Sequence, residues 1–341
     1  MTLNHQTKIW LILISLWVIN GSSFLAIKVA IDTIPPLLSA GLRFSIAGAI
    51  LFTVYFLQVN QNRFGKHLGS EHSQKMLEAG PQVQFPVKVS RERITLHQWK
   101  DSLILGVTLF LGGQGLLTWG AQYLSSGMTG LLNSTIPLWV AIIGYLIYRW
   151  LKKGAPGKKM SKVTILGLVT GFSGLMLLIG PSVGSGDLDP IGTIALIISS
   201  VFWAIGSIYS TRAQLPVSIL ASSGMIMITG GLMLTGVSFM FGEYKNLDLM
   251  QVSIQSIIAQ IYLIGIITVV GFTDFYWLLR VTSASLANTF AYVSPVIAVL
   301  LGWAILHENL TLITVIAMAI ILAGVALMVT KKRAPSKSKQ I

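Results

Sequence analysis

The sequence contains no cysteine and few charged residues. Of its 341 residues, 10% are Asp, Glu, Lys or Arg and 53% are hydrophobic, and the mean hydropathy is +0.75. The lack of cysteine excludes disulfides, thiolate metal ligands and thiol catalysis. A soluble domain carries roughly 25% charged residues, so this chain lacks the polar surface that a protein surrounded by water requires. We therefore expect it to lie in a lipid bilayer.

Acidic residues are scarcer than basic ones. The chain has 11 Asp and Glu against 24 Lys and Arg, for a formal net charge of +13. In a soluble protein this excess would suggest a nucleic-acid partner, but here the basic residues lie between the apolar runs and at the C-terminus. Cytosolic loops of membrane proteins are enriched in Lys and Arg. We therefore predict no nucleic-acid partner, and a multi-pass protein of the cell (plasma or inner) membrane with both termini in the cytosol.

Long apolar runs recur along the chain. Each has roughly 20 residues, the length with which a helix crosses about 30 Å of hydrocarbon. Helices are expected because each backbone group in lipid must be satisfied within its own segment. The sequence predicts an all-α membrane protein with ten transmembrane helices, at about residues 9–30, 35–57, 100–121, 125–148, 162–180, 190–211, 216–241, 254–279, 284–306 and 311–330.

The segments 125–150 and 283–308 resemble each other. Their alignment pairs Pro137 with Pro295, Gly144 with Gly302 and, upstream, Trp119 with Trp277 and Gly113 with Gly271. Each half then has five helices, and this odd number places the second copy upside down in the membrane. We expect one repeat at residues 1–180 with a cytosolic loop at 58–99, an inverted repeat at 190–330, and a basic cytosolic tail at 331–341. Inverted repeats are typical of transporters that work by alternating access.

Two stretches of the chain resemble the EamA-type permeases of the drug/metabolite transporter (DMT) superfamily. They are WVINGSSFLAIKVA followed by PPLLSAGLRF in the first half, and LANTFAYVSPVIAVLLGWAILHENLT in the second. The first half departs from the family pattern, because Tyr148, Arg149 and Trp150 stand where the family usually has an acidic residue. The resemblance implies a ten-helix protein that exports metabolites, amino acids or drugs. It also implies a Lys in the first membrane helix, which Lys28 matches.

Four ionisable residues lie within the predicted membrane helices or at their ends, where a charge is costly and often functional. Lys28 either extends to the outer headgroups or contacts substrate. Arg43 either bonds to carbonyls or an acidic partner, or contacts substrate. Asp274 is a candidate proton-coupling residue, and the alternative is a fixed hydrogen-bonded or ion-paired group. Glu308, in the link after the ninth helix, is interpreted as a solvated residue or a helix cap.

A second set of candidates is polar or aromatic. Gln114, Thr118 and Gln122 follow one another at intervals of four residues, so they share a helix face. Polar groups beside tryptophan rings suit an amphipathic solute, and hydrogen bonding between helices is the alternative. The predicted substrate-binding residues are Lys28, Gln114, Thr118, Trp119, Gln122, Trp203, Trp277, Asn288 and Tyr292, with Asp274 as the ion-coupling candidate.

These patterns predict a secondary transporter that exports small metabolites, amino acids or drug-like amphipathic solutes, with or without proton coupling. An uncoupled facilitator of the same fold is the first alternative, and a membrane-embedded enzyme or a sensor is the second. No phosphate loop, metal-ligand cluster or catalytic pair is recognisable, so we predict neither enzyme activity, nor a metal, nor a cofactor. The sequence leaves open the solute, the coupling ion and whether the protein is a monomer or a homo-oligomer.

Overall fold

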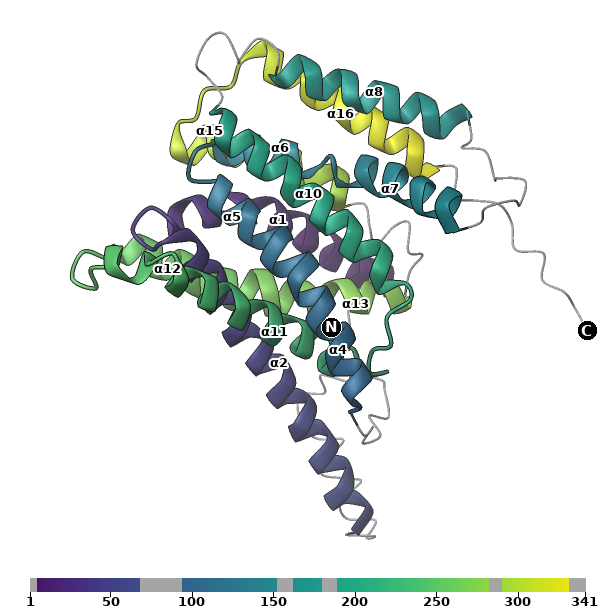
Figure 1. Cartoon of the computed structure of the whole chain (residues 1–341), viewed down its shortest axis with the longest axis vertical. Coiled ribbons are helices and arrows are strands. Elements are labelled where there is room, and N and C mark those ends of the chain that lie inside the picture. Colours follow the sequence, from purple (N-terminus) through teal and green to yellow (C-terminus); the bar gives the residue numbers. More distant parts are fainter. Residues whose placement is uncertain (1–4, 68–93, 152–161, 180–188, 282–289, 331–341) are drawn as a thin grey trace, which may run out of the picture.

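The structure is a computed structural model that describes residues 5–67, 94–151, 162–179, 189–281 and 290–330. All its regular elements in these ranges are helices (Figure 1). Asn288, most of the predicted loop 58–99 and the tail 331–341 lie outside the described residues. The first part of the chain forms α1 (His5–Ala30), α2 (Pro36–His67), α4 (Leu96–Leu105), η1 (Gly106–Gly115), α5 (Leu116–Gly120), α6 (Ser126–Asn133), α7 (Ile136–Leu151) and α8 (Lys162–Ile179).

The second part repeats much of this order. It forms α10 (Pro190–Ser210), α11 (Ile219–Met240), the short η2 (Glu243–Asn246), α12 (Ile254–Tyr262), η3 (Leu263–Val270), α13 (Gly271–Val281), α15 (Phe290–Leu306) and α16 (Leu312–Thr330). Both η1 and η3 are π-helical stretches within a longer helix. The offset that pairs Gly113 with Gly271 also brings these two π-helical stretches into register.

Within the described ranges, six helical segments are long and apolar enough to cross a membrane. They are Gln6–Ala30, Pro36–Val59, Leu96–Gly120, Ser126–Ile147, Pro190–Ser210 and Ile219–Met240. Shorter apolar helices occupy Lys162–Leu177, Ile254–Val270, Val293–Leu306 and Leu312–Leu327. The prediction of an all-helical membrane protein is therefore confirmed.

Two helices extend beyond the predicted membrane spans. The apolar segment Pro36–Val59 agrees with the predicted span 35–57, but helix α2 continues to His67, and its last turns extend beyond the neighbouring helices (Figure 1). The extension contains Gln, Asn, Arg and Lys but no proline, so nothing in it prevents a helix from continuing into water. Helix α4 begins at Leu96 because Thr95 and Gln98 form a capping box, with the Gln98 side chain accepting from the Thr95 amide at 2.8 Å.

The predicted helix at 125–148 is divided. Helix α6 ends at Asn133 and α7 begins at Ile136. Pro137 explains the division, because proline has no N–H to continue the hydrogen-bond ladder from the preceding turn. Its repeat partner Pro295 lies inside α15, so the two equivalent prolines have different local outcomes.

Helices of the two parts interlock. The stretch η1 packs against α10 and α11, while η3 packs against α1 and α2. Helix α1 also packs against α15, and α10 packs against α6 and α7. In each part, the third long helix (α4–η1–α5 or α12–η3–α13) therefore contacts the first two helices of the other part of the chain through its π-helical stretch.

Two helix pairs join equivalent members of the two parts. Helix α2 packs against α11, and α8 packs against α16; Figure 1 shows α8 and α16 side by side at one edge of the bundle. Small residues allow these close contacts. A Cβ added to Gly324 would lie within 2.6 Å of the Gly171 Cα, so only glycine fits there.

Candidate functional site

The Lys28 side chain caps the C-terminal end of α5. Its Nζ donates hydrogen bonds to the carbonyl oxygens of Leu124 at 2.7 Å, Ala121 at 2.9 Å and Gln122 at 3.1 Å. An ammonium group has three donors, and all three are used here. The carbonyls at a helix C-terminus carry partial negative charge, so a cation is favourable at this position.

Glu308 holds the beginning of α6. Its carboxylate accepts hydrogen bonds from the Ser126 amide, from the Ser126 hydroxyl at 3.0 Å and from the Gly127 amide at 3.1 Å. The interpretation of Glu308 as a helix cap is confirmed. Lys28 and Glu308 thus lie on either side of the α5–α6 link and attract each other across it. The link is fixed between a cation at one helix end and an anion at the next.

The turn that positions Glu308 depends on two neighbouring residues. His307 has a φ of 54°, in the left-handed region that often ends a helix. The Glu308 amide then donates to the Gly302 carbonyl at 3.1 Å. A Cβ on Gly302 would overlap the Glu308 carboxylate and would lie 2.6 Å from the Ser126 hydroxyl oxygen. Glycine at 302 therefore makes room for the cap.

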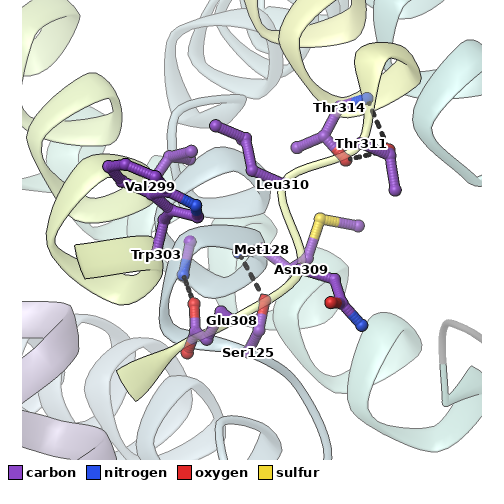
Figure 2. A pocket seen from close by; sticks show the side chains of 10 residues that line it. Ser125, Met128, Val299, Trp303, Glu308, Asn309, Leu310, Thr311 and Thr314 are labelled. Atoms are coloured by element: carbon purple, nitrogen blue, oxygen red, sulfur yellow. Dashed lines mark hydrogen bonds between the residues drawn. The ribbon is translucent and has the colours of Figure 1, made fainter. Parts of the chain in front are cut away.

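A cavity of about 450 Å³ adjoins this cap (Figure 2). It lies between the beginning of α6, the last turns of α15, the α15–α16 link and the beginning of α16. Figure 2 shows the chain running from Glu308 past Asn309 and Leu310 to Thr311. The lining residues are Ser125, Gly127, Met128, Val299, Trp303, Glu308, Asn309, Leu310, Thr311 and Thr314. None of them is among the predicted substrate-binding residues.

Asp274 lies against α1. Its Oδ2 accepts a hydrogen bond from the Ser15 hydroxyl at 3.0 Å, which joins α13 to α1. One turn further along α13, Trp277 lies below Lys8, whose Nζ is 5.3 Å from the ring centroid. Apolar residues that include Leu13 and Leu278 pack beside this pair of contacts. The structure thus brings Asp274 and Trp277 to the same α1–α13 contact.

Arg43 is buried between α2 and η3. Its side chain is 7% exposed, and its Nε donates to the Thr268 hydroxyl at 3.0 Å. The Thr268 hydroxyl in turn donates to the Leu263 carbonyl at 2.8 Å. The guanidinium carbon also lies 4.8 Å from the Phe44 ring centroid. Arg43 thus links α2 to the π-helical stretch of the other half.

The uncharged candidates have different surroundings. Thr118 is buried and Gln114 is partly buried, whereas the Gln122 side chain is exposed. The three tryptophans lie against different partners. Trp119 stacks edge-on with Tyr123 at 5.2 Å between ring centroids, Trp203 lies against Gly113 and Trp277 lies below Lys8. Tyr292 is within α15, its side chain is not described, and Asn288 lies outside the described residues.

The sequence reasoning missed two carboxylates that connect helices. Glu243 accepts from the Leu37 and Leu38 amides at 3.3 and 3.0 Å and so caps α2 from the α11–α12 link. Asp101 accepts from the Tyr209 hydroxyl at 2.7 Å and from the Gln214 amide at 2.6 Å. Acidic residues are scarce in this sequence, which could have singled out Glu243 and Asp101 as candidates. Their partners could not be predicted, because they are more than a hundred positions away along the chain.

The fold and these contacts define a multi-pass α-helical membrane protein built from two similar halves. The pattern of the EamA-like transporter family matches residues 83–180 and 190–330. The chain belongs to this family, which confirms the resemblance, and it is a membrane transporter.

Two relatives illustrate the similarity. The uncharacterized transporter YoaV of Bacillus subtilis (strain 168) is 26% identical over 323 residues, covering 94% of this chain and 96% of that protein. The uncharacterized inner membrane transporter YedA of Escherichia coli (strain K12) is 28% identical over 321 residues, covering 94% and 90%. A solved crystal structure with 18% identity has a TM-score of 0.56 and covers 96% of this chain and 99% of that one. This last likeness shows the fold alone.

Proposed function

We propose that the protein is a secondary transporter of the cell membrane that exports small metabolites, amino acids or amphipathic solutes by alternating access. Its family and its relatives, among them an inner membrane transporter, support this class of function. The observation that carries the mechanism is the interlocking of equivalent helices. The π-helical stretch of each half packs against the first two helices of the other half.

The proposed architecture has ten membrane crossings arranged as two inverted five-helix repeats. The six long apolar helices and four shorter ones found among the described residues are compatible with this number. The distribution of Lys and Arg supports cytosolic termini. Equivalent helices meet as the pairs α2–α11 and α8–α16, which is the arrangement expected around a pseudo-two-fold axis.

The π-helical stretches are the points at which we propose that the helices bend during the transport cycle. A π-helix has wider and less regular hydrogen bonding than an α-helix, and such segments are frequent at functional sites. Both η1 and η3 lie in the middle of their helices, at the contact between halves. If η1 and η3 each change between two backbone geometries during the cycle, the space between the halves can open alternately to the two sides of the membrane.

Asp274 is the proposed proton-coupling residue. Its carboxylate lies in α13, within the predicted membrane span 254–279, and accepts a hydrogen bond from the Ser15 hydroxyl of α1 at 3.0 Å. A carboxylate whose hydrogen bond from the described residues comes from a neutral hydroxyl at a helix contact can change protonation when the helices separate. The same hydrogen bond also suits a purely structural role in joining α13 to α1. An experiment therefore has to distinguish proton coupling from this structural role.

The test is uptake by proteoliposomes that contain the purified protein, with radiolabelled amino acids and cationic dyes, with and without an imposed pH gradient. Asp274→Asn is compared with wild type and with the control Asp248→Asn. Asp248 is a matched control because the bonds that its carboxylate accepts within the described residues are local, from the Met250 amide at 3.0 Å and the Gln251 side chain at 2.8 Å.

Saturable uptake that increases with the gradient in wild type and in Asp248→Asn, but not in Asp274→Asn, would support proton-coupled transport. Saturable uptake that responds to neither the gradient nor Asp274→Asn would identify the uncoupled facilitator. If wild type transports none of the solutes, the transport proposal fails for these substrate classes and the enzyme and sensor alternatives gain support.

A further inference from the structure

The cavity beside Glu308 lies at the edge of the helix bundle. It lies between the beginning of α6, the end of α15 and the beginning of α16 (Figure 2). Helix α16 pairs with α8 at the edge of the bundle (Figure 1). Its volume of about 450 Å³ is within the range of about 300–1,000 Å³ that small-molecule sites occupy. None of the residues used in the transport proposal lines it, so its role is a separate question.

The exposed side chains beside the cavity are those expected where lipid headgroups meet acyl chains. Trp303 is one turn before the end of α15 and is 55% exposed, and tryptophans at the ends of membrane helices lie at the headgroup level. On either side of it in the sequence, Leu300 is 49% exposed and Leu312 is 75% exposed. Apolar side chains this exposed in a membrane protein face lipid. An amphipathic molecule of the bilayer can therefore reach the cavity from the side.

One part of the lining suits a primary ammonium group. A carboxylate has about four acceptor sites, and Glu308 uses three of them for the amide and hydroxyl of Ser126 and the amide of Gly127. Among the described residues, these are the hydrogen bonds that the carboxylate accepts, so an acceptor site remains for a further donor. The Trp303 indole lines the same cavity, and an indole face attracts cations.

The other part of the lining suits a phosphate group. The hydroxyl oxygens of Thr311 and Thr314 are 2.9 Å apart, so one hydroxyl hydrogen is used between them and the other is available. The Asn309 side chain, which also lines the cavity, contributes an amide with two donors. Figure 2 shows the two threonines at the end of the link opposite to Glu308. The cavity therefore offers an acceptor at one end and donors at the other.

We propose that this cavity binds the headgroup of an ethanolamine phospholipid. The ammonium group bonds to the Glu308 carboxylate beside Trp303, and the phosphate accepts hydrogen bonds from Thr311, Thr314 and Asn309. The acyl chains lie along the exposed apolar surface of α15 and α16. The shared chemistry is a zwitterion with a primary ammonium and a phosphate, and the lipid is chosen over a soluble zwitterion because the cavity is flanked by lipid-facing side chains.

The test measures lipids retained by the purified full-length protein in detergent, by native mass spectrometry. The protein is incubated with phosphatidylethanolamine, phosphatidylcholine or phosphatidylglycerol that carry identical acyl chains. The variants are Glu308→Gln, which removes the charge, and Thr314→Phe, which fills the cavity without touching the Glu308 cap. Leu232→Phe is the matched control, because Leu232 is exposed on α11, away from α15 and α16, and does not line the cavity. Circular dichroism and thermal unfolding check that each variant folds.

Wild type and Leu232→Phe are expected to retain the ethanolamine lipid best and the glycerol lipid least, because the glycerol lipid has no cation. Glu308→Gln and Thr314→Phe should each weaken retention of the ethanolamine lipid about tenfold, the equivalent of one charge-assisted hydrogen bond or more. Equal retention of the three lipids by wild type, or retention unchanged in a folded Thr314→Phe, would overturn the proposal.

A further sample contains soluble glycerophosphoethanolamine as competitor. The lipid should bind much more tightly, since its acyl chains contact the apolar surface. If the soluble compound binds as tightly as the lipid, the occupant is a soluble zwitterion and the assignment to a lipid is wrong. These measurements use no transport assay, so their outcome is independent of whether the transport proposal holds.

Discussion

Replacing Lys28 with methionine separates the two roles that the sequence left open for this residue. Methionine keeps an unbranched side chain of similar length and removes the ammonium group. In the structure this group donates to the carbonyls of Ala121, Gln122 and Leu124, and it touches no predicted substrate-binding side chain among the described residues. We therefore expect Lys28→Met to destabilise the fold and to leave substrate affinity unchanged.

The magnitude follows from the three bonds. A hydrogen bond to a charged group contributes about 1.5–3 kcal/mol. The bond to Gln122 is exposed, and water can replace it; the bonds to Ala121 and Leu124 are partly buried. Counting these two at the lower value gives a loss of about 3 kcal/mol in the free energy of unfolding. The loss appears as a Tm several degrees lower than that of wild type.

The assay is thermal unfolding in detergent together with KM in proteoliposomes. Lys245→Met is the matched control, because it makes the same change in the exposed η2 segment, where the Lys245 Nζ lies 6.0 Å from the Tyr244 ring centroid. We expect the control to keep the wild-type Tm. An unchanged Tm in Lys28→Met combined with the loss of saturable uptake would refute our reasoning and assign Lys28 to the substrate.

Two further predictions concern the turn at the end of α15. Gly302→Ala should lower the free energy of unfolding by about 1–3 kcal/mol, because the added Cβ overlaps the Glu308 carboxylate and displaces the cap of α6. The control Gly236→Ala should cause no loss, because no atom lies within 4 Å of its added Cβ. Equal Tm values for the two variants would contradict the steric argument. His307→Gly should be more stable than His307→Ala by about 1 kcal/mol, since alanine keeps the cost of a positive φ that glycine removes. Chemical denaturation of the two His307 variants measures this difference, and a more stable alanine variant would show that the left-handed turn is not populated.

Hydropathy predicted most of the helices, and the physical reason is local. Whether a segment of about 20 residues prefers lipid to water depends on the sum of its own side chains, so no tertiary contact enters. The structure adds to the predicted spans where local composition is ambiguous. The polar end of α2 continues as a helix to His67, and the two equivalent prolines break one helix at Pro137 but are accommodated inside another at Pro295.

The candidate site was less predictable. The sequence singled out Lys28 and Asp274 because charges are rare in membrane helices, but it did not reveal their partners. Ser15, which bonds to Asp274, is separated from it by most of the chain. The cavity beside Glu308 was not predicted at all, because its lining comes from α6, α15 and α16 and consists of residue types that are ordinary in each helix.

By itself, the sequence determined that this is a helical membrane protein of the EamA-like family with two related halves. Hydropathy, charge distribution and internal similarity are properties of the chain that can be read without coordinates. Only the tertiary structure decided that Lys28 and Glu308 meet the two ends of one link, and that η1 and η3 each pack into the opposite half. Such contacts depend on how distant segments pack together, and a carboxylate or an ammonium group bonds to whichever helix end that packing brings within reach.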